Sequence, residues 1–245
     1  MRKYYVTFQP QNRTVQVEAD TSLLDAIKKK LPSGSIEKVY AVDGQIMYKT
    51  IDDLPPCGVC GSGVIDLVAV LLKEGLINRS GGFLNRADPR FISVKGNTRF
   101  ILVPGNETKN GKQHIYITES DIENIITAKA AIFATMKILL RRLDLSFDNI
   151  DRFYIAGAFG NYLNVENAVT IGLIPNIDRN KVEFMGNTSI KGAKIVAFYK
   201  EALRRMEKIR EHTTYDDLMG APDYVEEFQK AMFLPHTDIE IFERD

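Results

Sequence analysis

Two glycine-rich segments in the second half of the chain contain residue types that hold phosphorylated ligands. They are Gly157-Ala158-Phe159-Gly160 and Gly186-Asn187-Thr188-Ser189. Glycine lets the backbone approach a ligand closely, and the free N–H groups at a helix start attract anions. Neither segment matches the dinucleotide pattern G-x-G-x-x-G or a P-loop. Together they indicate either two loops that clasp an adenosine or two ordinary turns, in which Asn187 and Ser189 would be helix caps.

A third glycine-rich segment contains the only two cysteines of the chain, Cys57 and Cys60, in a C-x-x-C spacing. Such a pair is either redox-active, half of a metal site, or simply two small residues in a turn, and the last interpretation is favoured. Cys60-Gly61-Ser62-Gly63 opens a helix, where it serves either an anionic ligand or tight packing. Two cysteines alone cannot hold a four-ligand iron–sulfur cluster.

The remaining candidate side chains carry weaker signals. Lys129 lies within helical reach of Ile126 and Phe133, so it is either near a nucleotide or, as favoured here, a surface lysine whose stem crosses apolar residues. No Ser-His-Asp or paired-carboxylate arrangement can be argued from spacing. The three histidines are far apart and have no metal-ligand spacing: His114, His212 and His236.

The two glycine loops are each preceded by a strand pattern and followed by a helix pattern. Strands are expected at residues 153–156 and 182–185, and helices at 165–171 and about 190–209. Strands that alternate with helices favour an α/β sheet with parallel neighbours. Ligands of such sheets bind beyond the carboxyl ends of the strands, where these loops lie.

The first part of the chain reads as hairpins and helices with strong local signals. Alternating residues predict a hairpin over 4–8 and 14–18, helix caps follow at 20–22, and this strand–strand–helix order opens a β-grasp fold. The remaining expected elements are a hairpin at 38–42 and 45–49 around Asp43-Gly44, a helix from 62 to 72 that stops at Gly75, strands in FISV and RFILV, and a capped helix from 118 to about 143.

Composition limits the class of protein. The 245 residues are 44% hydrophobic and 26% charged, with Lys+Arg and Asp+Glu both 32, which is typical of a soluble globular chain and gives no global attraction to nucleic acid or anionic lipid. No signal peptide or membrane segment is visible, so a cytoplasmic location is expected. Basic residues dominate 191–210 and acidic residues dominate 216–245. Solvated surfaces are the favoured explanation, and a tail that covers a basic surface or docks a partner is the alternative.

Four stretches together resemble one known family. They are CGVCGSGVIDLVAVLLKEGLI, ITESDIENIITAKAAIF, FYIAGAFGNYLNVENAVTIGLIP and FMGNTSIKGA. They look like the carboxyl-terminal domain of the reductive activators of corrinoid proteins, which are ATPases of the actin, heat-shock protein and sugar-kinase superfamily, called ASKHA. The resemblance runs from about Gly34 to the end of the chain and includes the tail YDDLMGAPDYVEEFQKAMFLPH.

The resemblance implies a fold, a reaction and a set of site residues. The expected activity is ATP-dependent reduction of a cobalt(II) corrinoid protein to cobalt(I), with ATP and Mg as cofactors. The implied partner is a corrinoid protein or corrinoid-dependent methyltransferase, and a homodimer is the expected assembly. By similarity, Gly157, Ala158, Phe159 and Gly160 fall on the adenosine-binding loop, Gly186, Asn187 and Ser189 on the following loop, and Cys60, Gly61, Ser62 and Gly63 on the family's Cys-Gly-Ser-Gly turn.

The sequence also departs from this family. Electrons in the family pass through a ferredoxin-like 2Fe-2S domain, but the loop with four cysteines is absent, as are both Asp-x-Gly-Thr phosphate loops. The expected organisation is a partial β-grasp segment at 1–33 and a partial ASKHA ATPase domain at 34–245, as in an internally deleted member. Phosphoryl transfer needs the missing groups. The alternatives are a non-catalytic remnant that binds a nucleotide or partner, and an activator ATPase of 2-hydroxyacyl-CoA dehydratases, in which two cysteines per subunit hold a shared 4Fe-4S cluster.

Overall fold

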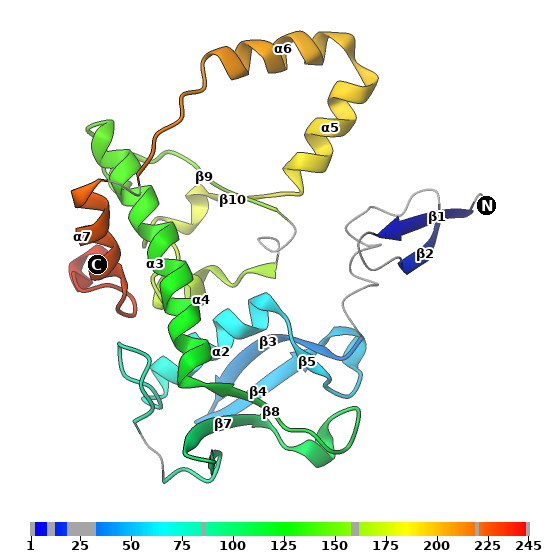
Figure 1. Ribbon diagram of the computed structural model, residues 1–245, viewed down its shortest axis with the longest axis vertical. Helices are drawn as coiled ribbons and strands as arrows, with labels where there is room; N and C mark the ends of the chain where they lie inside the picture. Colours follow the sequence, from blue (N-terminus) through cyan, green and yellow to red (C-terminus); the bar gives the residue numbers. More distant parts are fainter. Residues whose placement is uncertain are drawn as a thin grey trace.

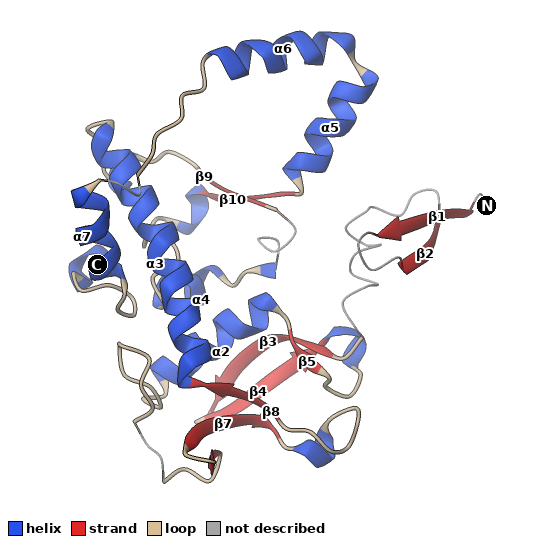
Figure 2. Cartoon of the chain, viewed as in Figure 1, coloured by secondary structure: helices blue, strands red, loops and turns tan. Residues whose placement is uncertain are grey.

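The computed structural model describes residues 3–8, 13–18, 33–84, 87–157, 162–218 and 221–243. Figures 1 and 2 show a mixed arrangement of helices and short sheets. The strands are β1 Lys3–Phe8, β2 Arg13–Glu18, β3 Ser35–Val42, β4 Gln45–Thr50, β5 Gly58–Val59, β6 Phe91–Val94, β7 Asn97–Val103, β8 Ile115–Thr118, β9 Phe153–Ala156 and β10 Val182–Gly186. The helices are α2 Gly61–Lys73, α3 Glu119–Arg142, α4 Val165–Thr170, α5 Thr188–Phe198, α6 Lys200–Glu211 and α7 Pro222–Ala231.

The first sheet has the strand order β4-β3-β5, with β3 and β4 antiparallel and β5 parallel to β3. Asp43 and Gly44 both have positive φ, as the tight turn between β3 and β4 requires, so the predicted hairpin is confirmed. Helix α2 packs against β3 and is buried on most of its sides, because Leu67, Ala69 and Val70 are buried as well as Ile65 and Val68. It ends where predicted, at the left-handed Gly75.

The second sheet, β6-β7-β8, is antiparallel throughout and leads into the long helix α3. The two predicted strands are β6 and β7, whereas the short β8 had no strong pattern and was missed. Helix α3 begins at the predicted capping box, in which Thr118 Oγ1 accepts from the Asp121 backbone N–H at 3.2 Å and the Asp121 carboxylate accepts from the Thr118 N–H at 2.9 Å.

The third sheet contains only β9 and β10, which are parallel neighbours as predicted. Helix α4 follows β9, and α5 follows β10. The predicted single helix over 190–209 is wrong, because Tyr199 has extended backbone angles and separates α5 from α6. The break follows a run of β-branched and aromatic residues, which are weak helix formers.

The hydrophobic core joins α2 to the first two sheets and to α4, and a smaller cluster joins α3 to α7 around Phe133 and Ala231. Figure 1 shows α7 lying along α3, while α5 and α6 arch away from this body. At the amino end, β1 and β2 form the predicted antiparallel hairpin. The helix expected after residues 20–22 lies outside the described residues, so the partial β-grasp segment stays a prediction.

Candidate functional site

The structure brings the two glycine loops together at the carboxyl ends of β9 and β10. The Gly157 backbone N–H donates to the Gly186 carbonyl at 2.8 Å. Both residues have positive φ, +109° at Gly157 and +66° at Gly186, which glycine adopts without strain. A Cβ on Gly157 would meet no atom of the described residues within 4 Å, so these residues leave the space beside Gly157 open. Ala158, Phe159 and Gly160 lie outside the described residues.

The second loop leads directly into the first turn of α5. The Asn187 side chain caps this helix, because its Oδ1 accepts from the Ile190 N–H at 3.1 Å. Thr188 and Ser189 are exposed on the first turn. The free N–H groups of such a turn favour an anionic ligand. The cap interpretation of Asn187 is therefore confirmed, because its side-chain oxygen accepts a hydrogen bond from the first turn of α5.

The Cys-Gly-Ser-Gly turn fixes α2 onto β3. The Cys60 N–H donates to the Ile36 carbonyl at 2.9 Å, and the Ser62 hydroxyl donates to the Glu37 carbonyl at 3.0 Å. A Cβ on Gly63 would lie 2.5 Å from the Ile36 oxygen, so only glycine fits there. Ser62 and Gly63 are buried, whereas Gly61 is exposed at the helix start. This geometry supplies the tight-packing role that the sequence allowed.

The two cysteines are not joined in a disulfide and lie in different surroundings. Cys57 is exposed, while Cys60 is half-buried with its Sγ 3.1 Å from the Ser62 Oγ. Within the described residues, no group of three or more His, Cys, Asp or Glu side chains is placed to hold a metal ion.

A buried polar pair inside the core was missed by the sequence reasoning. Asp66 is 3% exposed, and its carboxylate accepts from the Asn167 side-chain amide at 2.7 Å and from the Val39 N–H at 3.3 Å. Burial raises the pKa of Asp66, although these hydrogen bonds partly oppose the shift. Lys73 Nζ donates to the side-chain oxygen of Asn167 at 3.0 Å. An aspartate within an otherwise apolar helix run was the available signal. The pair ties α2 to α4, the helix that follows the first glycine loop.

Lys129 is not a surface residue, so the favoured sequence interpretation is wrong. Its side chain is 1% exposed, and Nζ donates to the carbonyls of Phe233 and Pro235 at 2.5 and 2.6 Å. Burial, with the nearby Arg79 charge, lowers the pKa of Lys129 to about 7. Arg79 donates to the neighbouring carbonyls of Leu234, at 3.1 Å, and of His236. Lys129 on α3 and Arg79 after α2 thus both bind the carbonyls of the C-terminal segment.

The same segment contains a buried acid–base pair. His236 Nδ1 accepts from the Asp238 N–H at 3.0 Å, so Nε2 carries the proton that it donates to Glu227 at 2.9 Å. Lys137 Nζ lies 2.7 Å from the same carboxylate. Burial alone would raise the pKa of Glu227, but the hydrogen bonds from His236 and Lys137 outweigh it and hold the pKa at about 2. Part of the acidic tail therefore covers the basic face of α3.

Most of the chain matches one known protein family. The sequence model of one family, described as the C-terminal domain of RACo, the ASKHA domain, matches residues 30–244. The chain belongs to this family. The RACo domain assignment confirms the expected ASKHA fold and indicates that nucleotide binding is a property of this class. The boundary between the two parts of the chain, expected at residues 33 and 34, stays a prediction.

Named relatives agree with the RACo assignment. The chain is 36% identical over 204 residues to the corrinoid activation enzyme RamQ of Eubacterium limosum, which covers 80% of this chain and 34% of RamQ. It is 32% identical over 164 residues to the Co(II) methylated amine-specific corrinoid protein reductase of Methanosarcina barkeri, covering 67% of this chain and 26% of that protein. A solved reductive activator for a corrinoid, iron-sulfur protein matches with a TM-score of 0.80 and 42% identity, covering 86% of this chain and 34% of that one.

This RACo-type chain thus spans only 26–34% of the length of these relatives. The two cysteines present in the whole sequence do not fit a 2Fe-2S cluster, which takes four ligands. The paired glycine loops, with open space above Gly157 and the start of α5 beside them, do fit a nucleotide. None of the described helices is long and apolar enough to cross a membrane.

Proposed function

We propose that this chain takes part in the ATP-dependent reductive activation of a corrinoid protein, in which cobalt(II) becomes cobalt(I). The observation that carries the proposal is the family match over residues 30–244, together with relatives and a solved structure that are named for corrinoid activation. The partner on this proposal is a corrinoid protein or a corrinoid-dependent methyltransferase. Each reduction consumes one electron, which an external reductant or a partner protein supplies.

We assign the adenosine side of the nucleotide site to the two glycine loops. Gly157 and Gly186 lie side by side with left-handed backbones, and the open space beyond Gly157 admits a ligand against the main chain. Ala158, Phe159 and Gly160 complete the first loop by similarity. Ser189, on the exposed first turn of α5, and the helix N–H groups offer polar contacts to an anion. The Cys60–Gly63 turn contributes to this site by fixing the position of α2 on β3.

The phosphate side of the site and the electron supply lie outside this chain on the same proposal. No Asp-x-Gly-Thr sequence occurs in the 245 residues, and phosphoryl transfer depends on groups that position the phosphates and Mg. We therefore expect the chain by itself to bind a nucleotide better than it hydrolyses one.

Titration calorimetry with ATP and with ADP tests the nucleotide site. Wild type should bind both, and Gly157→Ala should weaken binding by tenfold or more, because a Cβ stiffens and fills a loop that contacts the ligand. Gly96→Ala is the matched control, since Gly96 also has a positive φ (+84°) and open space but lies in the β6–β7 turn. No binding by wild type, or equal effects of the two substitutions, would remove the adenosine assignment.

A non-catalytic role is the second candidate, and the missing phosphate loops favour it. A chain of this kind would bind a nucleotide or a corrinoid protein without turnover. Phosphate release by the isolated chain distinguishes the two. Turnover above the level of a Gly157→Ala control would exclude the non-catalytic role, whereas binding without turnover would support it.

A further inference from the structure

A series of polar contacts crosses the apolar core between α2 and α4. Lys73 Nζ donates to the Asn167 side-chain oxygen at 3.0 Å, and the Asn167 side-chain amide donates to the Asp66 carboxylate at 2.7 Å. The other oxygen of this carboxylate accepts from the Val39 N–H at 3.3 Å. Asp66 and Asn167 are only 3% and 7% exposed, so a hydrogen bond lost here is not replaced by water at low cost.

The series of contacts has a hydrogen-bond donor at each end, which makes the carboxylate of Asp66 necessary. The Lys73 ammonium group and the Val39 backbone N–H only donate, whereas a side-chain amide such as that of Asn167 accepts on one side and donates on the other. A series that begins and ends with donors therefore needs one member that only accepts, and Asp66 is that member. An amide in place of this carboxylate would leave two donors facing each other in every orientation of the two amides.

Asn167 lies where the first glycine loop passes into α4. Its backbone N–H donates to the Asn164 side chain, the cap of α4, at 3.1 Å, while its own side chain is bound to Asp66 on α2. At the other end of the same loop, the Gly157 N–H is bound to the Gly186 carbonyl. The loop is therefore held at two points, one on the second glycine loop and one on Asp66.

We propose that Asp66 and Asn167 are positioning residues of the nucleotide site, because they fix the end of the first glycine loop that leads into α4. This inference rests on the assignment of the adenosine site to the glycine loops. A small displacement of a loop that contacts a ligand lowers affinity, since the backbone groups no longer lie where the ligand needs them. The order of donors and acceptors in the core thus acts on the nucleotide through the loop.

Exchanges between Asp and Asn test this role, because the two side chains differ in hydrogen-bonding groups and hardly in shape. Asp66→Asn brings two donors into contact, and Asn167→Asp brings two carboxylates into contact. Each should raise the ADP dissociation constant by about tenfold in titration calorimetry. The double exchange D66N/N167D moves the acceptor to position 167, where Lys73 and the amide at position 66 both donate to it. It should return the constant to within about twofold of the wild-type value.

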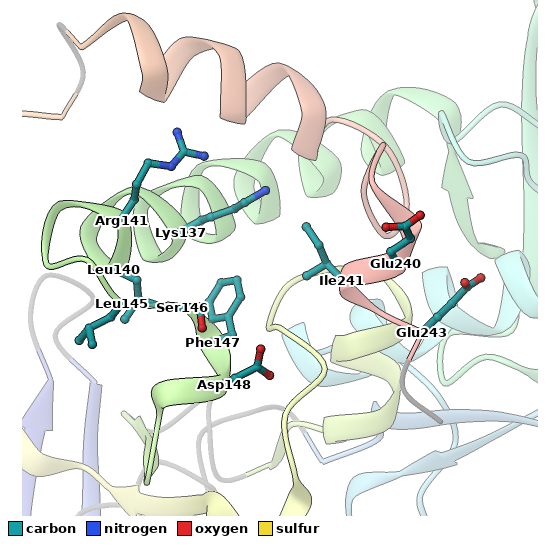
Figure 3. Close-up of a pocket in the computed structure, with 10 residues that line it drawn as sticks. All are labelled: Lys137, Leu140, Arg141, Leu145, Ser146, Phe147, Asp148, Glu240, Ile241 and Glu243. Carbon is teal, nitrogen blue, oxygen red and sulfur yellow. The ribbon is translucent and has the colours of Figure 1, made fainter.

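A purely structural role would lower stability and leave nucleotide affinity unchanged. Glu227→Gln is the matched control, because it also replaces a buried carboxylate by its amide, but on α7, which packs on α3 in a separate cluster. Figure 3 shows Lys137 and Arg141, the two cations that bind Glu227, on α3. At a temperature where circular dichroism shows every variant folded, Glu227→Gln should keep the ADP constant within about twofold of wild type.

Lys73→Met covers the case in which Asp66→Asn does not fold. Lys73 is exposed, so its replacement leaves the core filled, but Asn167 loses the donor that fixes the orientation of its amide. The ADP dissociation constant should rise about fivefold. Lys49→Met, at an exposed lysine of β4, removes the same charge and should leave the constant within about twofold.

The outcomes separate this role from the nucleotide site itself. Absence of ADP binding by wild type would remove the adenosine assignment and the positioning role with it. Binding by wild type that Asp66→Asn and Lys73→Met leave unchanged would overturn the positioning role alone. A double exchange that folds but stays as weak as the single exchanges would overturn it as well, because the order of donors and acceptors would then not decide the affinity.

Discussion

The buried carboxylate of Glu227 allows a sharp test of how the C-terminal segment is held. Its side chain is 2% exposed and faces Lys137, His236 and Arg141. Glu227→Gln keeps the shape but removes the negative charge, and breaking a buried pair in this way costs about 3–5 kcal/mol. We expect the free energy of unfolding at pH 7 to fall by about 3 kcal/mol. This value is at the lower end of that range, because Arg141 is 53% exposed and water screens its attraction to Glu227.

The pH dependence gives an independent magnitude. The pKa of Glu227 is about 2 in the folded chain, against 4.5 for the ordinary side chain. Above pH 4.5 the carboxylate is ionised in both states and its contribution is complete. As the pH falls toward 2, the unfolded chain binds a proton that the folded chain does not, and the contribution disappears. The difference in pKa corresponds to about 3 kcal/mol, which agrees with the substitution.

Urea unfolding followed by circular dichroism measures both effects. At pH 3 about 2 kcal/mol of the contribution should be gone, so wild type and Glu227→Gln should differ by only about 1 kcal/mol. Glu226→Gln is the matched control, because Glu226 forms an exposed i,i+4 pair with Lys230, and this substitution should change the free energy of unfolding far less than Glu227→Gln does. A loss below 1 kcal/mol at pH 7, or an equal difference at both pH values, would refute the reasoning.

Three further outcomes follow from other buried contacts. The pKa of Lys129 is about 7 in the folded chain, against 10.5 for the ordinary side chain, so the unfolded chain binds more protons than the folded chain between these pH values. In urea titrations, the free energy of unfolding of wild type should therefore rise by about 2 kcal/mol relative to Lys129→Met between pH 7 and 9. Gly172→Ala should lower the free energy of unfolding by about 2 kcal/mol or more, as overpacking a core does, because its Cβ would overlap the Pro235 carbonyl. Gly75→Ala is the comparison, because its Cβ would meet no atom within 4 Å and only the positive φ is disfavoured. Asn167→Ala should lower the melting temperature by several degrees, because it leaves the buried Asp66 carboxylate without its amide donor. A loss no larger than that of Asn106→Ala, at an exposed asparagine, would contradict this.

The sequence predicted the elements whose signals are local. The Asp43-Gly44 turn, the Thr118–Asp121 capping box and the Gly75 stop act within a few residues, and each lies where expected. The parallel pairing of β9 and β10 followed from the alternation of strands and helices. The proximity of Gly157 and Gly186 was therefore predictable, because both lie at the ends of strands of one sheet.

The features that the sequence could not predict depend on contacts between distant residues. Lys129 meets acceptors 104 and 106 positions away, and its amphipathic surroundings fit a surface lysine equally well until α7 and the following segment cover it. The Asp66–Asn167 pair spans 101 positions. The break at Tyr199 was hidden because the residues on both sides have helical periodicity. Local patterns do not encode which segment covers a given face.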